Sequence, residues 1–375
     1  MRIAVLANLK INAPTWDGMP ADQWDDLDDE ATINSLVVAL EQHGHAATFF
    51  EASILPPFSL VERLLAFQPD LCFNIAESHS GDGREAQIPA LLEMLRIPYT
   101  GSQVMTLALT LDKPMTKRIL HNHELPTPEF QVFERADEPI DLDLVDANGD
   151  LRFPMFVKPS REGTSMGVSA RSIVQTVAEL RERVAEQLAR YSQPILCERY
   201  IKGREVTVGM LGNLRPNAAR RLNDQVAYDL PPETLTFLPT LEVDTQAHAA
   251  TEADLYTSRM KTEMVEEFKY ICPAPISAAL ERQLQLIAGA VFKVTGCKDV
   301  ARVDFRLDES AGYAPYVLEI NPLPGLTPGF SDLCVQAEVA GWRYDQLINA
   351  IVEHAARRCG LTAATDDAKV DQAAL

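Results

Sequence analysis

Two oxygen-bearing side chains end an apolar segment near position 320, where they could bind a metal ion. The segment YVLEIN carries Glu319 and Asn321, which lie two positions apart and therefore point to the same face of a strand. An earlier apolar segment, ARVDFRL, carries Asp304. If the two segments pair as a hairpin, the three side chains converge, and their oxygens match the ligands that Mg²⁺ prefers. Polar strand ends that pair with one another for solubility are the alternative.

A cation accompanies this group. Arg302 lies two residues before Asp304 and therefore shares its face of the strand. An arginine there could hold an acyl phosphate or the oxyanion of a tetrahedral intermediate. A buried carboxylate is costly without a nearby cation, and this cost favours a functional cluster over a solubilising one.

A second candidate is the segment VKPSREGTSMGV, at positions 157–168. An apolar strand delivers Lys158, and a loop of small residues, Ser160–Gly167, follows it. Gly163 and Gly167 permit backbone conformations that a Cβ atom would block. Hydroxyl and N–H groups of such a loop can surround phosphate oxygens. An ordinary surface turn with a lysine at a strand end explains the same residues equally well.

A third candidate, PILCERYIKGREVTV at positions 194–208, could contact a nucleotide base. Extended backbone at Cys197–Ile201 would offer N–H and C=O groups to an adenine edge, and Glu205 could accept from ribose hydroxyls. An ordinary hairpin explains this segment as well. The chain has neither the G-x-x-x-x-G-K-[ST] run of a P-loop nor a G-x-G-x-x-G after its first strand. These absences weigh against a Walker-type kinase and a dinucleotide oxidoreductase.

The composition is that of a soluble globular protein without nucleic acid or membrane partners. The 375 residues include 34 Lys plus Arg and 54 Asp plus Glu, giving a net charge of −20. A nucleic-acid binder would need an excess of cations. No apolar run reaches the roughly 18–20 residues that span a membrane. The six cysteines are scattered without a C-x-x-C pair, so we expect reduced thiols and a cytoplasmic protein.

The first hundred residues alternate between apolar strands and amphipathic helices, which predicts a parallel sheet with helical crossovers. The predicted strands and helices are Arg2–Asn8, Ala31–His43, Ala47–Ala52, Leu60–Phe67 and Leu71–Ala76.

The rest of the chain mixes strands and helices around a long polar insertion, Asn213–Pro273. The pattern changes at Leu107, the segment LDKPMTKRILHNHELPTP from Leu111 predicts a helix ended by a proline-rich turn, and the tail beyond Thr362 is predicted to be disordered. The other predicted elements are the strands Phe130–Phe133, Met155–Ser160, Pro194–Ile201, Glu205–Leu211, Ala301–Leu307 and Tyr316–Asn321, with helices Val177–Tyr191, Ser277–Thr295 and Tyr344–Arg358.

Taken in order, these segments resemble the D-alanine–D-alanine ligase family of the ATP-grasp superfamily. The matching segments are PYTGS, LDK, VKPSREGTSMGV, ILCERYIKGREVTV, GCKDVARVDFRL and LEINPLPGLTP. The resemblance implies an α/β ATP-grasp fold with an N-terminal parallel-sheet domain, a small central domain and a C-terminal α+β domain. The implied boundaries are 1–104, 105–196 and 197–360, followed by a disordered tail at 361–375.

The resemblance also implies a role for each matching residue, with ATP and Mg²⁺ or Mn²⁺ as cofactors. Nucleotide-binding residues would be Lys113, Lys158, Ser160, Glu198, Ile201 and Glu205; metal ligands Asp304, Glu319 and Asn321; and catalytic residues Arg302, Gly325, Lys261 and Thr164. A lid formed by Arg161–Gly167 and part of Gln246–Glu266 would shield the acyl phosphate from water.

The sequence departs from the family pattern where the family binds amino acids. The family's glycine-rich loop and helix start are replaced by a longer acidic segment, in which Glu30 is the nearest candidate for the family's glutamate. Glu77-Ser78 replaces a His-Gly pair, and Thr164 and Thr262 stand where the family has serine and tyrosine. The nucleotide end is retained and the amino-acid end is altered, which favours a changed substrate.

The implied activity is ATP-dependent peptide or amide bond formation between two small amino acids through an acyl phosphate. A ligase with another acid and amine, or with a hydroxy acid, is the alternative. A non-catalytic nucleotide-binding regulator is a third reading, which Arg302 argues against, because nucleotide binding alone would not need it. Family members imply a homodimer and a role in cell wall biogenesis.

Overall fold

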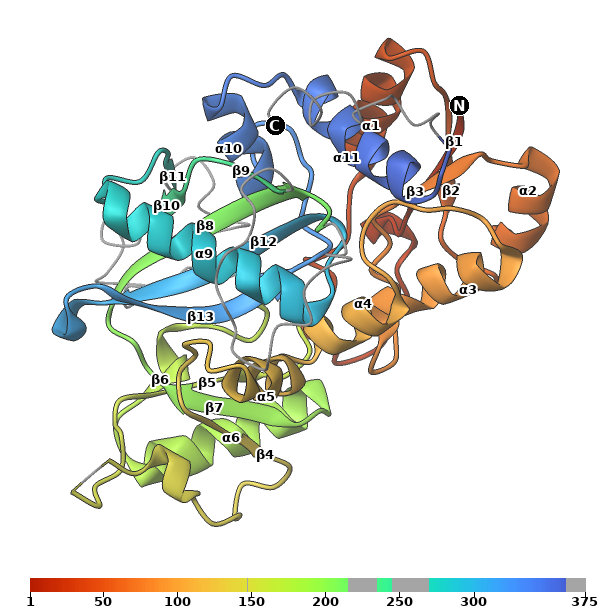
Figure 1. Ribbon diagram of the computed structural model, residues 1–375. Helices are drawn as coiled ribbons and strands as arrows, with labels where there is room; N and C mark the ends of the chain where they lie inside the picture. The colour runs from red at the N-terminus through yellow and green to blue at the C-terminus, as the bar shows by residue number, and fades with distance from the viewer. Residues whose placement is uncertain (147, 215–234, 245–269, 362–375) are drawn as a thin grey trace.

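The computed structural model describes residues 1–146, 148–214, 235–244 and 270–361, and the described strands form three sheets (Figure 1). Two predictions fall outside these ranges: the disordered tail, apart from Leu361, and the lid segment Gln246–Glu266. Within the described ranges, no helix has the length and apolar character to cross a membrane.

The first sheet is parallel, with the strand order β2-β1-β3, as the alternating pattern predicts. Residues Ile3 to Ala7 have no exposed surface, because helices and the rest of the chain cover both faces of the sheet. The first helix begins where Asp29 accepts a hydrogen bond from the N–H of Thr32 at 2.8 Å. The elements are β1 (Arg2–Ala7), α1 (Glu30–Gln42), β2 (Ala46–Glu51), α2 (Leu60–Phe67) and β3 (Leu71–Asn74).

The second sheet is antiparallel, with the order β4-β7-β5-β6. Helix α6 (Val177–Tyr191) has the predicted bounds and buries Leu180 and Val184 against the sheet. The strands are β4 (Phe130–Phe133), β5 (Met155–Pro159), β6 (Ile173–Val174) and β7 (Ile195–Arg199). The predicted boundary at residue 196 cuts through β7, and we therefore propose that the central domain extends to Arg199.

The third sheet carries the predicted hairpin and is also antiparallel, with the order β11-β10-β8-β12-β13 and β9 beside β8. Helix α9 (Ala278–Thr295) packs on β8, β12 and β13, and α10 (Asp332–Val339) packs on β8. The polar insertion expected at 213–273 is interrupted by three short strands, so that prediction was wrong for its described parts. The strands are β8 (Gly203–Gly212), β9 (Leu235–Phe237), β10 (Leu241–Val243), β11 (Tyr270–Ile271), β12 (Asp299–Asp308) and β13 (Ala314–Asn321).

Helices α3 (Gln87–Leu95) and α4 (Val104–Leu111) lead from the first sheet to the others, and α5 (Lys113–Asn122) follows directly. The helix expected in the segment that begins at Leu111 is α5, and α4 precedes it. Asp112 separates them, because it has extended backbone and caps α5 by accepting from the N–H of Met115 at 2.9 Å. This cap places Lys113 at the first position of α5.

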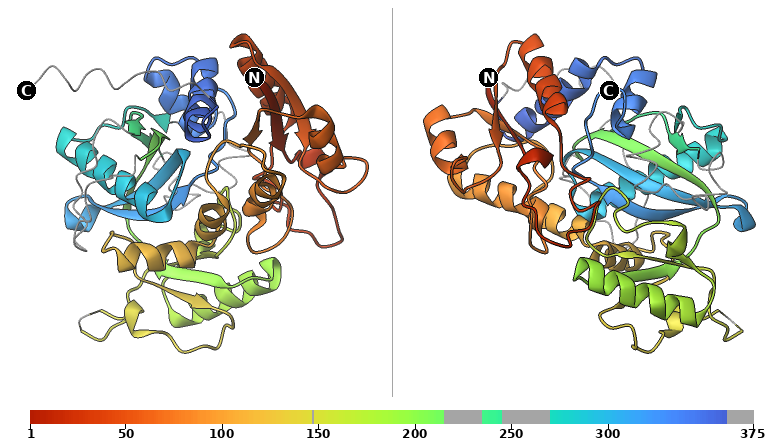
Figure 2. Two further views of the ribbon diagram at one scale, coloured as in Figure 1. Left: turned by 45° about the vertical axis from the view of Figure 1, so that its right-hand side comes forward. Right: turned by 180° about the vertical axis from the view of Figure 1, so that it is seen from behind.

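The C-terminal helix α11 (Tyr344–Arg358) returns to the first sheet and packs against α1 (Figure 2). Below it, the fully buried Asp299 accepts hydrogen bonds from the N–H of Gly101 at 2.9 Å and from Arg358 Nη2 at 2.7 Å. It also accepts from Asn213 Nδ2 at 2.7 Å. One buried carboxylate therefore links the segment at Gly101, which follows the first sheet, to the third sheet and to α11.

We predict that Arg358→Leu lowers the free energy of unfolding by about 3–5 kcal/mol, because it leaves the buried carboxylate of Asp299 without its cation. The matched control is Arg357→Leu, whose partner Glu353 lies 3.5 Å away with both side chains more than 60% exposed (65% and 63%). That change should cost under about 1 kcal/mol. Urea unfolding measures both, and equal losses would show that Asp299 does not need Arg358.

Candidate active site

Two adjoining cavities lie where the three sheets meet, and they share Lys113, Glu162 and Glu319. The first cavity lies between the second and third sheets. Its lining includes the predicted residues Lys113, Lys158, Glu198, Ile201, Glu205, Asp304 and Glu319. The second cavity extends toward the first sheet. Its lining adds Thr164, Arg302, Asn321 and Gly325.

The hairpin of β12 and β13 brings the predicted metal-binding residues together. Asp304 lies opposite Glu319, and Arg302 lies opposite Asn321. Asn321 Nδ2 donates to Asp304 Oδ2 at 2.9 Å. Thr207 Oγ1, from the neighbouring strand β8, donates to Asp304 Oδ1 at 2.5 Å.

Arg302 is held by carboxylates on two sides. Its Nε donates to Asp304 Oδ1 at 2.8 Å and its Nη2 to Asp304 Oδ2 at 2.9 Å, while Nη1 lies 2.9 Å from Asp332 Oδ2. Burial alone would lower the pKa of Arg302, but Asp304 and Asp332 raise it well above its usual value. The guanidinium is therefore fixed as a cation at the edge of the second cavity.

The donor set fits a hard divalent cation. Two carboxylates and an amide come from the adjacent strands β12 and β13: Asp304 lines the first cavity, Asn321 the second and Glu319 both, and oxygen donors of this kind suit Mg²⁺. Asp304 is fully engaged by Arg302, Thr207 and Asn321, so a metal ion would take over contacts that these donors now make.

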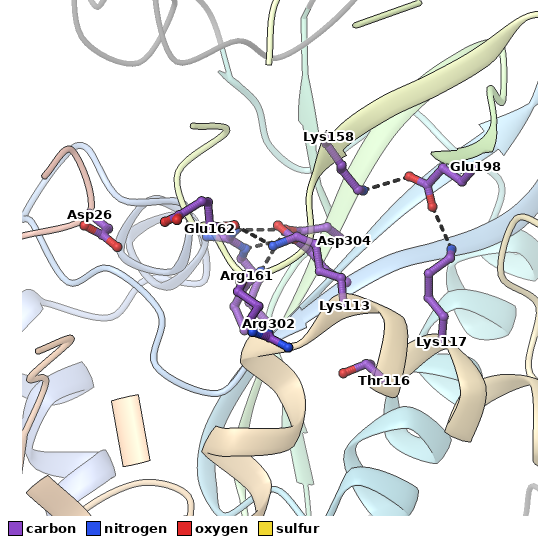
Figure 3. Close-up of polar contacts among 12 residues, drawn as sticks. Asp26, Lys113, Thr116, Lys117, Lys158, Arg161, Glu162, Glu198, Arg302 and Asp304 are labelled. Carbon is purple, nitrogen blue, oxygen red and sulfur yellow. Dashed lines mark hydrogen bonds and ion pairs between the residues drawn. The ribbon is translucent and has the colours of Figure 1, made fainter. Parts of the chain in front are cut away.

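A buried charge cluster lies deep in the first cavity, with Lys158 and Lys117 pointing at Glu198 (Figure 3). Lys158 Nζ lies 2.7 Å from one carboxylate oxygen and Lys117 Nζ 2.7 Å from the other. Burial lowers the pKa of Lys117 to about 8, with Glu198 opposing that shift. Burial would raise the pKa of Glu198, but the two lysines hold it below its usual value. Two cations thus share one carboxylate, leaving positive charge in the cavity.

Lys113 lies at the junction of the two cavities. Its Nζ lies 3.1 Å from Glu319 Oε2 and donates to the backbone oxygen of Glu162 at 2.6 Å. Its backbone N–H donates to the oxygen of Ser160 at 3.1 Å. The lysine therefore links the predicted phosphate loop to the metal-binding hairpin.

The loop Ser160–Gly167 has the turned backbone that the sequence predicts at Gly167, but not at Gly163. Thr164 and Ser165 have φ of 47° and 58°, and Gly167 has 74°, whereas Gly163 does not adopt a left-handed conformation. At Gly167 a Cβ atom would lie 2.9 Å from Pro159 Cγ, so glycine is required there. Thr164 faces the second cavity and Ser165 the first.

The acidic segment near residue 22 docks on this loop. Asp22 Oδ2 accepts from the N–H of Gly167 at 3.0 Å and from Tyr191 Oη at 2.9 Å. Its Oδ1 lies 2.8 Å from Arg190 Nη2. Burial would raise the pKa of Asp22, but these donors hold it below its usual value. The segment that departs most from the family pattern therefore forms a wall of the site.

Some expectations are not met or lie outside the described residues. Lys261 and Thr262 belong to the range that the structure does not describe. Ser160 is 1% exposed, is not in the lining of either cavity, and contributes its backbone. Glu30 begins α1 at the surface and also lines neither cavity, so it does not replace the family's glutamate.

Sequence reasoning missed Lys117, although a signal was present. It follows Lys113 by four residues, which places both on one face of a helix that begins at the site. It also missed Arg84, which lies 2.7 Å from Asp26 Oδ2 and 3.8 Å from Glu162 Oε2. No local pattern connects these three segments, because they meet only through the tertiary fold.

Comparisons with known proteins agree with this geometry. Residues 119–230 and 236–353 match the family model described as the D-ala D-ala ligase C-terminus. An uncharacterised protein of Sinorhizobium fredii is 35% identical over 87% of each chain. A D-alanine–D-alanine ligase of a Janthinobacterium species is 33% identical over 80% of this chain and 84% of its own. The crystal structure of a D-alanine–D-alanine ligase from Bacillus anthracis complexed with ATP has a TM-score of 0.67 at 22% identity, covering 96% of this chain and 99% of its own.

We predict that Lys117→Met weakens ATP binding about tenfold, corresponding to ~1.4 kcal/mol, because Glu198 then neutralises Lys158 completely. The matched control is Lys293→Met, which removes an exposed lysine of α9 and should leave affinity unchanged. Calorimetric titration with ATP measures both. Unaltered ATP affinity in a folded Lys117→Met variant would contradict the idea that Lys117 leaves Lys158 free to bind phosphate by sharing Glu198.

Proposed function

Because the chain belongs to the D-alanine–D-alanine ligase family of ATP-grasp enzymes and is an ATP-dependent ligase, we propose that it joins two small amino acids or related compounds through an acyl phosphate. The observation that carries this proposal is the position of Lys113. It lies beside Glu319 at the junction of a nucleotide-sized cavity and a second cavity that contains Arg302. A phosphoryl group would pass between the two cavities at that point.

The proposed reaction has two steps. A substrate carboxylate attacks the γ-phosphorus of ATP, and the bond to the β-phosphate oxygen breaks, leaving ADP and an acyl phosphate. An uncharged amine then attacks the acyl carbon, inorganic phosphate leaves, and the amine loses a proton. Both steps bring anionic oxygens together, so the site must supply positive charge.

The residues of this chain would divide that work. Lys158 and Lys113 would bind phosphate oxygens, and Arg302 would hold the oxyanion of the second step. Asp304, Glu319 and Asn321 would hold Mg²⁺, which neutralises phosphate charge when bound. Glu198, Ile201 and Glu205 would contact the adenosine, and the N–H of Gly325 would face the intermediate. Gly325 is constrained, because a Cβ atom there would lie 2.9 Å from Ser331 Oγ.

A ligase with other acid and amine substrates, or with a hydroxy acid as acceptor, is the second candidate. The observation that favours it is the lining of the second cavity, where Glu77, Asp26 and Thr164 stand in segments that depart from the family pattern. A homodimer in the cytoplasm belongs to the proposal by family resemblance, and sedimentation velocity tests the dimer.

The proposed function is tested by ADP release and product analysis. Purified protein with ATP and Mg²⁺ is given pairs of D- and L-amino acids, hydroxy acids and amines, and products are identified by mass spectrometry. We expect ADP release to require an acid substrate and to match the yield of a condensed product. ATP-binding protein that releases no ADP with any pair would overturn the ligase proposal for this chain.

We predict that Lys158→Met and Glu319→Gln each lower ADP release by at least about a hundredfold, because each removes charge that the transferring phosphoryl group requires. The matched control is Glu338→Gln, at an exposed position of α10, which should keep the wild-type rate. Circular dichroism confirms folding in each case. Near-normal turnover in either active-site variant would refute the assigned role.

A further inference from the structure

The second cavity has an unusual excess of carboxyl groups. Its described lining contains two cationic side chains, Lys113 and Arg302, and eight acidic ones: Asp25, Asp26, Asp28, Glu77, Glu85, Glu162, Glu319 and Asp332. A solvated acidic surface would be unremarkable in a chain of net charge −20. These groups are instead gathered in a cavity, where an uncompensated charge is costly.

The cations near the cavity do not match these carboxyl groups in number. Lys113 pairs with Glu319, and Arg302 pairs with Asp332. Lys10 reaches Asp25 from outside at 2.7 Å. These three pairs account for Glu319, Asp332 and Asp25. The other five acids of the lining are Asp26, Asp28, Glu77, Glu85 and Glu162.

Among the described residues, the ion pairs that these five acids form within 4 Å involve only Arg84. Arg84 lies 2.7 Å from Asp26 Oδ2 and 3.8 Å from Glu162 Oε2. The Asp26 side chain is only 6% exposed, and its second oxygen, Oδ1, has no hydrogen-bond donor within the described parts of the chain. Figure 3 places Asp26 beyond Glu162, on the side away from Lys158. A buried carboxylate oxygen on the wall of a cavity can accept a hydrogen bond from a ligand bound there.

The remaining acids crowd around Asp26. Burial raises the pKa of Glu77 well above its usual value, and Glu85 and Asp26 raise it further. Burial likewise raises the pKa of Glu85 and of Asp28, each to about 7. Carboxyl groups with such raised pKa values are partly protonated near pH 7, and a cation bound beside them would favour their charged forms.

A metal ion does not suit this arrangement. Within the described residues, no three His, Cys, Asp or Glu side chains come together in a way that could hold a metal. The carboxyl groups come from three segments, namely the acidic segment at Asp25–Asp28, the loop after β3 at Glu77 and the turn at Glu85. An organic ammonium group suits them, because its N–H groups can donate to several carboxylate oxygens.

We propose that one substrate of this ligase carries a second amino group, in addition to the single amino group of a simple amino acid or monoamine, and that Asp26, Glu77 and Glu85 bind it as an ammonium group. Diamino acids and diamines have this chemistry. The inference rests on the proposed function, since it assigns a substrate class to the second cavity. The reacting carboxylate or acyl phosphate would lie at Lys113 and Arg302, and the extra ammonium group at the opposite, acidic end.

The test compares compounds that carry a second amino group, called the charged compounds because of that extra ammonium charge, with compounds of similar length that lack it, called the uncharged compounds. Ornithine and lysine are paired with norvaline and norleucine, in both D and L forms, and diaminobutane is paired with butylamine. We expect the charged member of a pair to bind at least about tenfold more tightly by calorimetry in the presence of ATP and Mg²⁺. Its binding should also release protons at pH 7, because a nearby cation lowers the pKa of carboxyl groups.

A double variant, Glu77→Gln with Glu85→Gln, keeps the shape of both side chains and removes their charge. It should lose the preference for the charged compound and bind the uncharged one as before. The control variant Glu41→Gln, at an exposed position of α1, should keep the preference. Asp26→Asn tests the same cavity independently if the double variant does not fold.

The outcomes separate this inference from the proposed function. Equal or tighter binding of norvaline or norleucine would overturn the inference, even if the protein releases ADP and forms a product with them. Selective binding of a charged compound without ADP release from any pair would support the inference and overturn the ligase proposal. If only diaminobutane is preferred over its partner, the cavity binds the amine substrate. If ornithine or lysine is also preferred, the cavity binds an amino-acid substrate.

Discussion

The structure depends on one constraint: each charged side chain buried between the sheets needs a partner of opposite charge within ion-pair distance. Lys158 and Lys117 each form an ion pair with Glu198, and Arg302 forms ion pairs with Asp304 and Asp332. Breaking one such buried pair typically costs about 3–5 kcal/mol, whereas exchanging a partner for another of like charge costs far less. A phosphate group that arrives beside Lys158 or a metal ion beside Asp304 can therefore replace an existing partner. The site is folded in advance of its ligands for this reason.

Backbone geometry sets the distances over which this compensation works. The antiparallel register of β12 and β13 brings Asp304 opposite Glu319, and the cap at Asp112 brings Lys113 to the start of α5. The loop after β5 approaches both because Gly167 has no Cβ atom. These three elements belong to different parts of the chain. Helix α5 packs on α9, which packs on β12 and β13, and the loop after β5 joins them where the N–H of Lys113 donates to the oxygen of Ser160.

The parts predicted from the sequence are those with a local signal. Alternating apolar segments predicted the parallel sheet, and residues two apart on a strand predicted the shared face of Glu319 and Asn321. Strands β9, β10 and β11 were missed because they are only two or three residues long and lie in polar surroundings. Asp26 and Arg84 were missed because they meet through the fold and share no spacing.

The cations at the junction of the two cavities and the carboxyl groups of the second cavity lie in different places, and this separation bears on how an amino-acid substrate would bind. Cations from three elements surround the junction at Lys113, while Asp26, Glu77 and Glu85 lie toward the first sheet. An amino acid is itself a dipole, with an anionic carboxylate and a cationic ammonium group. In such a field the orientation with the carboxylate at Lys113 is favoured and the reverse is opposed at both ends, since like charges would meet. The excess acid at one end therefore does more than add affinity, because it also presents the carboxylate to the phosphate that must react with it.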